Sequence, residues 1–351
     1  MSLSERILGK KNVNGRPHIA AVTPSAALPG GEVRITGGGL KPPDLQRPKV
    51  RFGTNEGAIV VSSDDFVVAR VPDGASSGPL LIESGGQESN AIEVRVAIPV
   101  ADELHPVTNP AIDAQGNIYA TFSGARGQKA PVSVFKIDTD YTVQPLLTDI
   151  MNATALAFDR DGVLYVSSRY DGVVYRIGEN GAKRTFAEGM GIATGVAFDK
   201  DGNLYVGDRS GTIFKISRKG ETFVFATMEP SVSAYHLAFS PANVLHLTGP
   251  TNSSFDAVFQ IDDHGNVSEY YRGLGRPQGM AFDTAGNLYV ASSLGGKRGI
   301  VRITPERQAT LAVAGNHVVG LCFAPGKAAI IATNNAVYYL NLGVEGMPLF
   351  G

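Results

Sequence analysis

The chain has 351 residues, of which 18% are charged and 43% hydrophobic, and its formal net charge is −2. This ordinary globular balance gives no electrostatic reason to expect DNA, RNA or an anionic membrane surface as a partner. No run of about 18 apolar residues is present, so we expect no transmembrane helix. The 42 glycines stand between short apolar runs and favour many turns, and therefore many strands.

Residues 1–16 are polar and basic, and we interpret them as a flexible tail. They contain no apolar core of a secretory signal, which predicts a cytoplasmic location; if a leader has been removed, the location would be extracellular. The single cysteine, Cys322, lies in an apolar run. We therefore expect a buried core residue, and we exclude a disulfide framework and a cysteine metal cluster.

Residues 17–97 contain about seven short strand candidates with turn signals between them, which predicts a two-sheet sandwich. Residues 32–37 alternate polar and apolar side chains and so bury one face of a strand. The Thr23-Pro24-Ser25 turn, the Gly30-Gly31 pair and the Ile35-Thr36-Gly37 strand end resemble the start of an IPT/TIG immunoglobulin-like domain. Residues 71–79 and 89–91 are also similar to that family. The resemblance implies an immunoglobulin-like sandwich over 17–97.

One pattern recurs through residues 98–351: an apolar-Ala-Phe-Asp strand end, a Gly-Asn turn, and a Leu-Tyr-Val strand. It is clearest at 196–206 and 280–290. Copies centre on six positions that are 40 to 46 residues apart: Tyr119, Tyr165, Tyr205, His246, Tyr289 and Ile330. Four strands in each unit of this length predict a propeller blade, so we expect an all-β chain whose residues 98–351 form a six-bladed β-propeller.

The repeated letters have a physical reason. On the innermost strand, the small alanine lets neighbouring blades approach, and the aromatic residue fills the space between them. The Gly-Asn pair suits a tight hairpin turn. Two segments are candidates for the last outer strand of the ring: residues 348–350, or residues near 100–104 after the short link at 96–100.

The repeats resemble NHL-type propellers and, more distantly, the gluconolactonase and senescence-marker superfamily. This resemblance covers nearly all of residues 99–351. It implies a fold and no activity, because the same blade pattern occurs in binding proteins and in enzymes.

The loops that lead into the inner strands and those that leave the second strands meet at one mouth of a propeller. Equivalent positions in the repeats give the candidate ligand-binding residues Asn152, Thr154, Arg169, Asp208, Arg209, Tyr235, His236, Gln278 and His317. Arg169 and Arg209 are equivalent in adjacent repeats and could hold a carboxylate or phosphate; alternatively, each pairs with an aspartate of its own loop. Tyr235 and Gln278 would suit a sugar or a peptide.

The lactonase resemblance implies a divalent cation held by a glutamate, an asparagine and an aspartate. Here Asn109 and Thr194 stand at the first two positions, and only Asp208 matches. A zinc site built from His105, His236 and His317 is disfavoured, because their offsets from the inner strands differ. We therefore expect no cofactor, with one divalent cation such as calcium, bound by Asp208, as the alternative.

Our first hypothesis is a non-enzymatic binding or scaffold protein that recognises a peptide, a protein or a glycan at the propeller mouth. The alternative is a gluconolactonase-like, metal-dependent hydrolase with its ion in the central channel. Whether the chain is an enzyme stays open. The residues favour a binding protein, because only Asp208 matches the metal ligands of the lactonase pattern.

Overall fold

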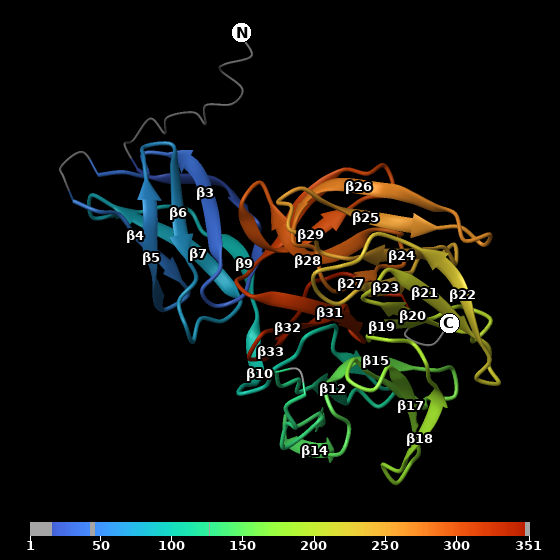
Figure 1. The fold of residues 1–351 in the computed structure, drawn as a ribbon. Helices are drawn as coiled ribbons and strands as arrows, with labels where there is room; N and C mark the ends of the chain where they lie inside the picture. The colour runs from blue at the N-terminus through green and yellow to red at the C-terminus, as the bar shows by residue number, and fades with distance from the viewer. Residues whose placement is uncertain (1–15, 43–45, 126, 348–351) are drawn as a thin grey trace.

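The computed structural model describes residues 16–42, 46–125 and 127–347. Throughout these residues the regular elements are β-strands, as predicted (Figure 1). No helix in the described part of the chain is long and apolar enough to cross a membrane. Of the tail expected at 1–16, only Arg16 lies within the described residues.

Strands β1 to β9 form the first body, drawn in blue in Figure 1. Strands β1, β3, β6 and β5 pair in that order, and β4, β7 and β9 pair in that order, all antiparallel. Buried side chains of both groups share one apolar cluster that includes Ile35, Phe52, Val67 and Ile82. The strands are β1 (His18–Thr23), β2 (Ala26–Ala27), β3 (Glu32–Gly38), β4 (Lys49–Phe52), β5 (Asn55–Ser62), β6 (Phe66–Arg70), β7 (Gly78–Ser84), β8 (Gln87–Glu88) and β9 (Ile92–Val96).

Strands β10 to β33 are arranged around a common centre, as in a β-propeller (Figure 1). Four blades are separate four-stranded sheets: β11–β14, β15–β18, β19–β22, and β31–β33 with β10. The series β23–β26 and β27–β30 belong to a 17-stranded sheet, because β26 pairs with β28 and β30 pairs with β2 of the first body.

The strands of the first three blades are β11 (Ala111–Ile112), β12 (Ile118–Thr121), β13 (Val134–Ile137), β14 (Val143–Leu147), β15 (Ala153–Phe158), β16 (Leu164–Ser168), β17 (Val173–Ile177), β18 (Lys183–Ala187), β19 (Ala193–Phe198), β20 (Leu204–Asp208), β21 (Thr212–Ile216) and β22 (Thr222–Thr227). The others are β10 (Ile98–Ala101), β23 (His236–Phe239), β24 (Leu245–Thr248), β25 (Asp256–Ile261), β26 (Val267–Gly275), β27 (Met280–Phe282), β28 (Leu288–Leu294), β29 (Lys297–Ile303), β30 (Ala309–Ala314), β31 (Val318–Ala324), β32 (Ala328–Thr333) and β33 (Val337–Leu340).

The ring is closed by the strand that follows the first body. Strand β10 pairs antiparallel with β33, with Ile98 opposite Tyr339 and Ala101 opposite Val337. Residues 98–101, which overlap both the expected link at 96–100 and the candidate outer strand near 100–104, therefore form the outer strand of the blade that contains β31–β33. The other candidate for this role, residues 348–350, lies outside the described residues.

Aromatic contacts between consecutive repeats explain the repeated letters. Each anchor ring meets the phenylalanine of the next inner strand edge-on, with centroids 4.9 to 5.2 Å apart. The pairs are Tyr119–Phe158, Tyr165–Phe198, Tyr205–Phe239, His246–Phe282 and Tyr289–Phe323. At the remaining junction Ile330 and Ile112 share an apolar cluster. The aromatic residue fills the space between blades, as predicted.

In four of the six repeats an aspartate holds the hairpin turn after the inner strand, at Asp113, Asp159, Asp199 and Asp283. Asp199 Oδ1 accepts hydrogen bonds from the backbone of Asp201 at 2.9 Å and Asn203 at 2.8 Å, and its Oδ2 accepts one from Asn203 Nδ2 at 2.8 Å. Asp113 and Asp283 make the equivalent bonds to their own asparagines. These acidic turns are Asx-type hairpins, as their sequence favours.

The first body is joined to the ring through backbone as well as side chains. Ala27 pairs in parallel with Ala314, and Leu28 N donates to Ala314 O at 2.8 Å. Arg95 Nη1 donates to Leu342 O at 3.0 Å. A Cβ on Gly31 would overlap Ala314 O, so only glycine allows this approach. Ala314 consequently belongs to the same apolar cluster as the first body.

Candidate functional site

A polar cavity of about 590 Å³ opens where loops of the last repeats meet. Gln278 precedes the inner strand β27, and His317 precedes the inner strand β31. Asn334 follows the second strand β32, and Ser292 lies on the second strand β28. All four line the cavity, together with Arg276 and Arg298. Loops into inner strands and out of second strands thus meet here, as expected of a propeller mouth.

Two arginines give this cavity its charge. In the described part of the chain, no hydrogen bond or ion pair engages the guanidinium of Arg276 or Arg298, and both residues are exposed. The backbone of Arg276 has a φ of 48° and that of His317 a φ of 58°, left-handed conformations that non-glycine residues rarely adopt. Such strain is often kept where side chains must be presented to a ligand.

The backbone of Gln278 is fixed by two hydrogen bonds. Its N–H donates to Ala291 O at 2.8 Å, and its carbonyl accepts from Thr248 Oγ1 at 2.8 Å. The described residues offer no hydrogen bond to its side-chain amide, and the residue lines the cavity. Of the nine residues expected from the sequence, Gln278 and His317 are the two that line this cavity.

Asn152 and Arg169 hold a loop of the preceding blade. The buried Asn152 amide donates to Gly124 O at 3.0 Å and to Ala125 O at 3.1 Å, and it accepts from Gly127 N at 2.9 Å. Arg169 Nη2 donates to the same Gly124 carbonyl at 2.8 Å. Both side chains are therefore engaged with the backbone of the first repeat, at Gly124, Ala125 and Gly127.

Thr154 and Tyr235 are buried between repeats. The Thr154 carbonyl accepts a hydrogen bond from Thr108 Oγ1 at 2.7 Å. The Tyr235 ring occupies the space that a Cβ on Gly207 or Gly249 would need, and its hydroxyl donates to Glu229 O. Burial raises the pKa of Tyr235 to about 12.

Asp208, the proposed cation ligand, caps a turn. Its Oδ1 accepts from Ile192 N at 2.9 Å and Ser210 N at 3.2 Å, and its Oδ2 accepts from Ser210 Oγ. Arg209 Nε donates to Ser231 O at 3.1 Å. Residues 16–42, 46–125 and 127–347 contain no group of three His, Cys, Asp or Glu side chains placed to hold a metal ion. The surroundings of Asp208 therefore do not fit a divalent cation.

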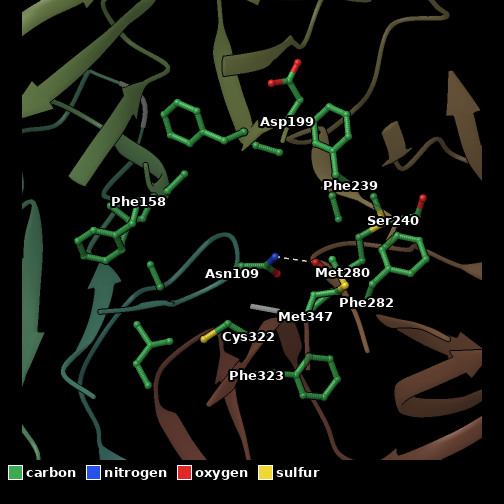
Figure 2. Close-up of a pocket in the computed structure, with 18 of the residues that line it drawn as sticks. Asn109, Phe158, Asp199, Phe239, Ser240, Met280, Phe282, Cys322, Phe323 and Met347 are labelled. Atoms are coloured by element: carbon green, nitrogen blue, oxygen red, sulfur yellow. Dashed lines mark hydrogen bonds between the residues drawn. The ribbon is translucent and has the colours of Figure 1, made fainter. Parts of the chain in front are cut away.

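The central channel also contains an apolar pocket of about 280 Å³ (Figure 2). Figure 2 shows Phe158, Phe239, Phe282, Phe323, Cys322, Met280 and Met347 around it, and Phe198 also lines it. Cys322 is buried, as expected, and burial raises the pKa of its thiol to about 12, so it is a core residue.

Asn109 crosses the channel at one side of this pocket (Figure 2). Its Nδ2 donates to Met280 O at 2.8 Å, and its Oδ1 accepts from Leu321 N at 3.1 Å. A Cβ on Gly279 or Gly320 would overlap the Asn109 side chain. Asn109, which the resemblance to lactonases would place at a metal-ligand position, therefore connects two inner strands. In the sequence, only the glycines that face it, Gly279 and Gly320, indicate this role.

His236 is equivalent in register to Asn109, since each lies two residues before an alanine that lines the apolar pocket. Only 3% of its surface is exposed, and its Nε2 has no hydrogen-bond partner among the described residues. Burial lowers the pKa of His236 to about 3, so the imidazole is neutral near pH 7.

Comparisons with known proteins establish the fold. The family model described as Strictosidine synthase-like, N-terminal, matches residues 195–216. Curated proteins give no significant match. Among solved structures, an auxiliary nutrient binding protein from Bacteroides thetaiotaomicron VPI-5482 is 13% identical, with a TM-score of 0.55 over 94% of this chain and 98% of that one. A gluconolactonase from Xanthomonas campestris is 14% identical, with a TM-score of 0.55 over 70% of this chain and 89% of that one.

A second auxiliary nutrient binding protein, from Bacteroides ovatus ATCC 8483, is 13% identical and has a TM-score of 0.54 over 94% of this chain and 98% of that one. At these identities the likeness concerns the fold alone. Propeller neighbours of this chain thus include both gluconolactonases and nutrient-binding proteins.

Proposed function

We propose that this protein is a non-enzymatic binding protein that takes an acidic group of a peptide or glycan ligand in the polar cavity at the mouth. The observation that carries the proposal is the pair of unengaged guanidiniums, Arg276 and Arg298, beside the Gln278 amide and the His317 imidazole. Arginine forks match carboxylates and phosphates, while the amide and imidazole can bond hydroxyl or amide groups of the same ligand.

The proposal includes the finer architecture. Six repeats of four strands would make a six-bladed, NHL-like ring over 98–351, since β23–β26 and β27–β30 pair in the same order as the four separate blades. Residues 17–97 would be an immunoglobulin-like sandwich of the IPT/TIG type, supported by the two strand groups around one apolar cluster. The nutrient-binding neighbours, which cover 94% of this chain, favour binding as the activity of such a pair.

A gluconolactonase-like hydrolase is the second candidate, favoured by the Xanthomonas campestris neighbour. It would need a divalent cation such as calcium in the channel. Asp208 is the one family-like ligand here, and its oxygens already accept three hydrogen bonds from its own turn and from Ile192. Binding is therefore the better-supported activity.

Calorimetric titration of the full chain with glucuronic acid, a glutamate-containing dipeptide and glucose tests the proposal. We expect the acidic ligands to bind and Arg276→Gln with Arg298→Gln to weaken binding by at least about tenfold, with glucose giving no signal. Arg209→Gln is the matched control, because this exposed arginine bonds a carbonyl elsewhere. Equal binding of glucose and glucuronic acid would refute the proposal. Calcium-dependent hydrolysis of a lactone, lost in Asp208→Asn, would establish the second candidate instead.

A further inference from the structure

A second cavity, of about 360 Å³, lies along strand β25, and its lining residues differ from those of the polar cavity at the mouth. Met228, Glu229 and Tyr235 line one side, and Asp256 and Phe259 of β25 line the other. Ser253 borders both cavities, so the loop 251–255 separates them. None of the residues expected to bind at the mouth reaches this cavity except the buried Tyr235.

Asp256 is the polar centre of this cavity. It is 4% exposed, and its Oδ1 accepts hydrogen bonds from Thr251 Oγ1 at 2.6 Å and Thr251 N at 3.2 Å. Its Oδ2 is buried, and no donor of the described chain lies within hydrogen-bond distance of it. A buried carboxylate oxygen without a donor is costly, so a bound group that donates hydrogen bonds to it would be stabilised here.

The charges around Asp256 favour a cation as that donor. Glu229 also lines the cavity. The one arginine of the lining, Arg272, is engaged: its Nε and Nη2 lie 2.7 and 2.6 Å from Glu269 Oε2, and its Nη1 donates to Phe255 O at 3.1 Å. Its positive charge is thus paired with a carboxylate outside the lining, and Asp256 is the one charged residue of the described lining that is buried.

The lining also includes apolar side chains, one of which is exposed. Met228, Phe259 and Val267 continue the cavity away from Asp256. Phe255 stands at its rim with 65% of its surface exposed, which is unusual for a phenylalanine next to a buried charge. An aromatic face at this place can cover an apolar chain or contact a cation.

We propose that this cavity binds an organic ammonium ion: a protonated primary amine on a short aliphatic chain. The ammonium group donates to Asp256 Oδ2, the chain lies against Met228 and Phe259, and the Phe255 ring covers it. An ammonium has three donors and no acceptor, which suits a carboxylate that lacks a donor. The proposal stands independently of the ligand at the mouth, because none of the arginines of that cavity lines this one.

Titration of the full chain with n-pentylammonium and with 1-pentanol, a neutral molecule of the same shape, tests the assignment. We expect the amine to bind at least about tenfold more tightly than the alcohol, and Asp256→Asn to abolish this preference. Asp256→Asn keeps the Oδ1 acceptor for Thr251. The matched control is Asp263→Asn, at an exposed hairpin carboxylate of the same repeat, which should leave amine binding unchanged.

Phe255→Ala provides a second variant, since an exposed side chain can be removed without loss of folding; it should weaken amine binding severalfold at an unchanged unfolding temperature. The assignment is overturned if 1-pentanol binds as well as the amine, if Asp256→Asn retains the preference for the amine, or if the folded wild-type chain binds neither molecule.

Discussion

The buried side chain of His236 makes the stability of the protein depend on pH. Burial holds the pKa of His236 at about 3 in the folded state, against 6.5 for an unperturbed imidazole. Below about pH 6.5 the imidazole is protonated in the unfolded chain and stays neutral in the folded chain. The free energy of unfolding therefore falls as the pH falls. The stabilisation is fully present above 6.5, and its loss continues down to about pH 3.

The size of the effect follows from the two pKa values. Between about pH 8 and about pH 5, a histidine whose pKa falls from 6.5 to about 3 lowers the free energy of unfolding by about 2 kcal/mol. His246, whose pKa burial lowers to about 4, contributes a similar amount over the same range. Together the two imidazoles account for a loss of about 4 kcal/mol.

Urea unfolding of the wild type and of His236→Asn at both pH values measures this contribution. Asparagine is the residue at the equivalent position in the first repeat and does not titrate. The variant should lose about 2 kcal/mol less than the wild type on acidification, whatever its stability at the higher pH. An identical pH dependence of the two proteins would refute the reasoning. His264→Asn, in an exposed hairpin, is the control and should behave as the wild type does.

Three further outcomes are expected. Asn109→Ala removes the bonds to Met280 O and Leu321 N and should lower the free energy of unfolding by about 2 kcal/mol, measured by urea unfolding; no change would mean that the bonds do not brace the inner strands. Gly31→Ala forces a Cβ against Ala314 O and should lower the unfolding temperature, whereas Gly178→Ala, whose Cβ would lie 3.5 Å from the nearest atom, should change it less. Asp199→Ala should cost about 1 to 2 kcal/mol through loss of the turn bonds, and Asp161→Ala, an exposed neighbour in the equivalent turn, under about 0.5 kcal/mol; equal effects would contradict the capping role.

The fold could be predicted because its determinants are local and repeated. A tyrosine on the second strand and a phenylalanine on the next inner strand meet in pairs such as Tyr165–Phe198, and an aspartate closes the hairpin in four of the six repeats. The closing strand could not be selected, because Ile98–Ala101 carries no repeat pattern and pairs with a strand more than two hundred residues away.

The candidate site could be predicted in part. Gln278 and His317 were found because equivalent positions of a ring meet at one mouth. Tyr235 is different: its side chain packs inward against two glycines, Gly207 of the preceding repeat and Gly249 of its own repeat. The sequence analysis did not include Arg276 or Arg298. Arg298 lies on the hairpin β28–β29, which extends further than the hairpins of the other repeats, and strand β28 of this hairpin also pairs with β26.

The pairing of β10 with β33 has a consequence for biosynthesis. A ribosome delivers Tyr339 more than two hundred residues after Ile98, and until then the outer edge of β10 has no partner from its own blade. Each nascent repeat can stack on the one before it, yet the ring stays open until β33 has been synthesised. Exposed strand edges of this kind recruit chaperones or other chains, so slow synthesis near residues 330–340 would lengthen the interval in which this protein aggregates.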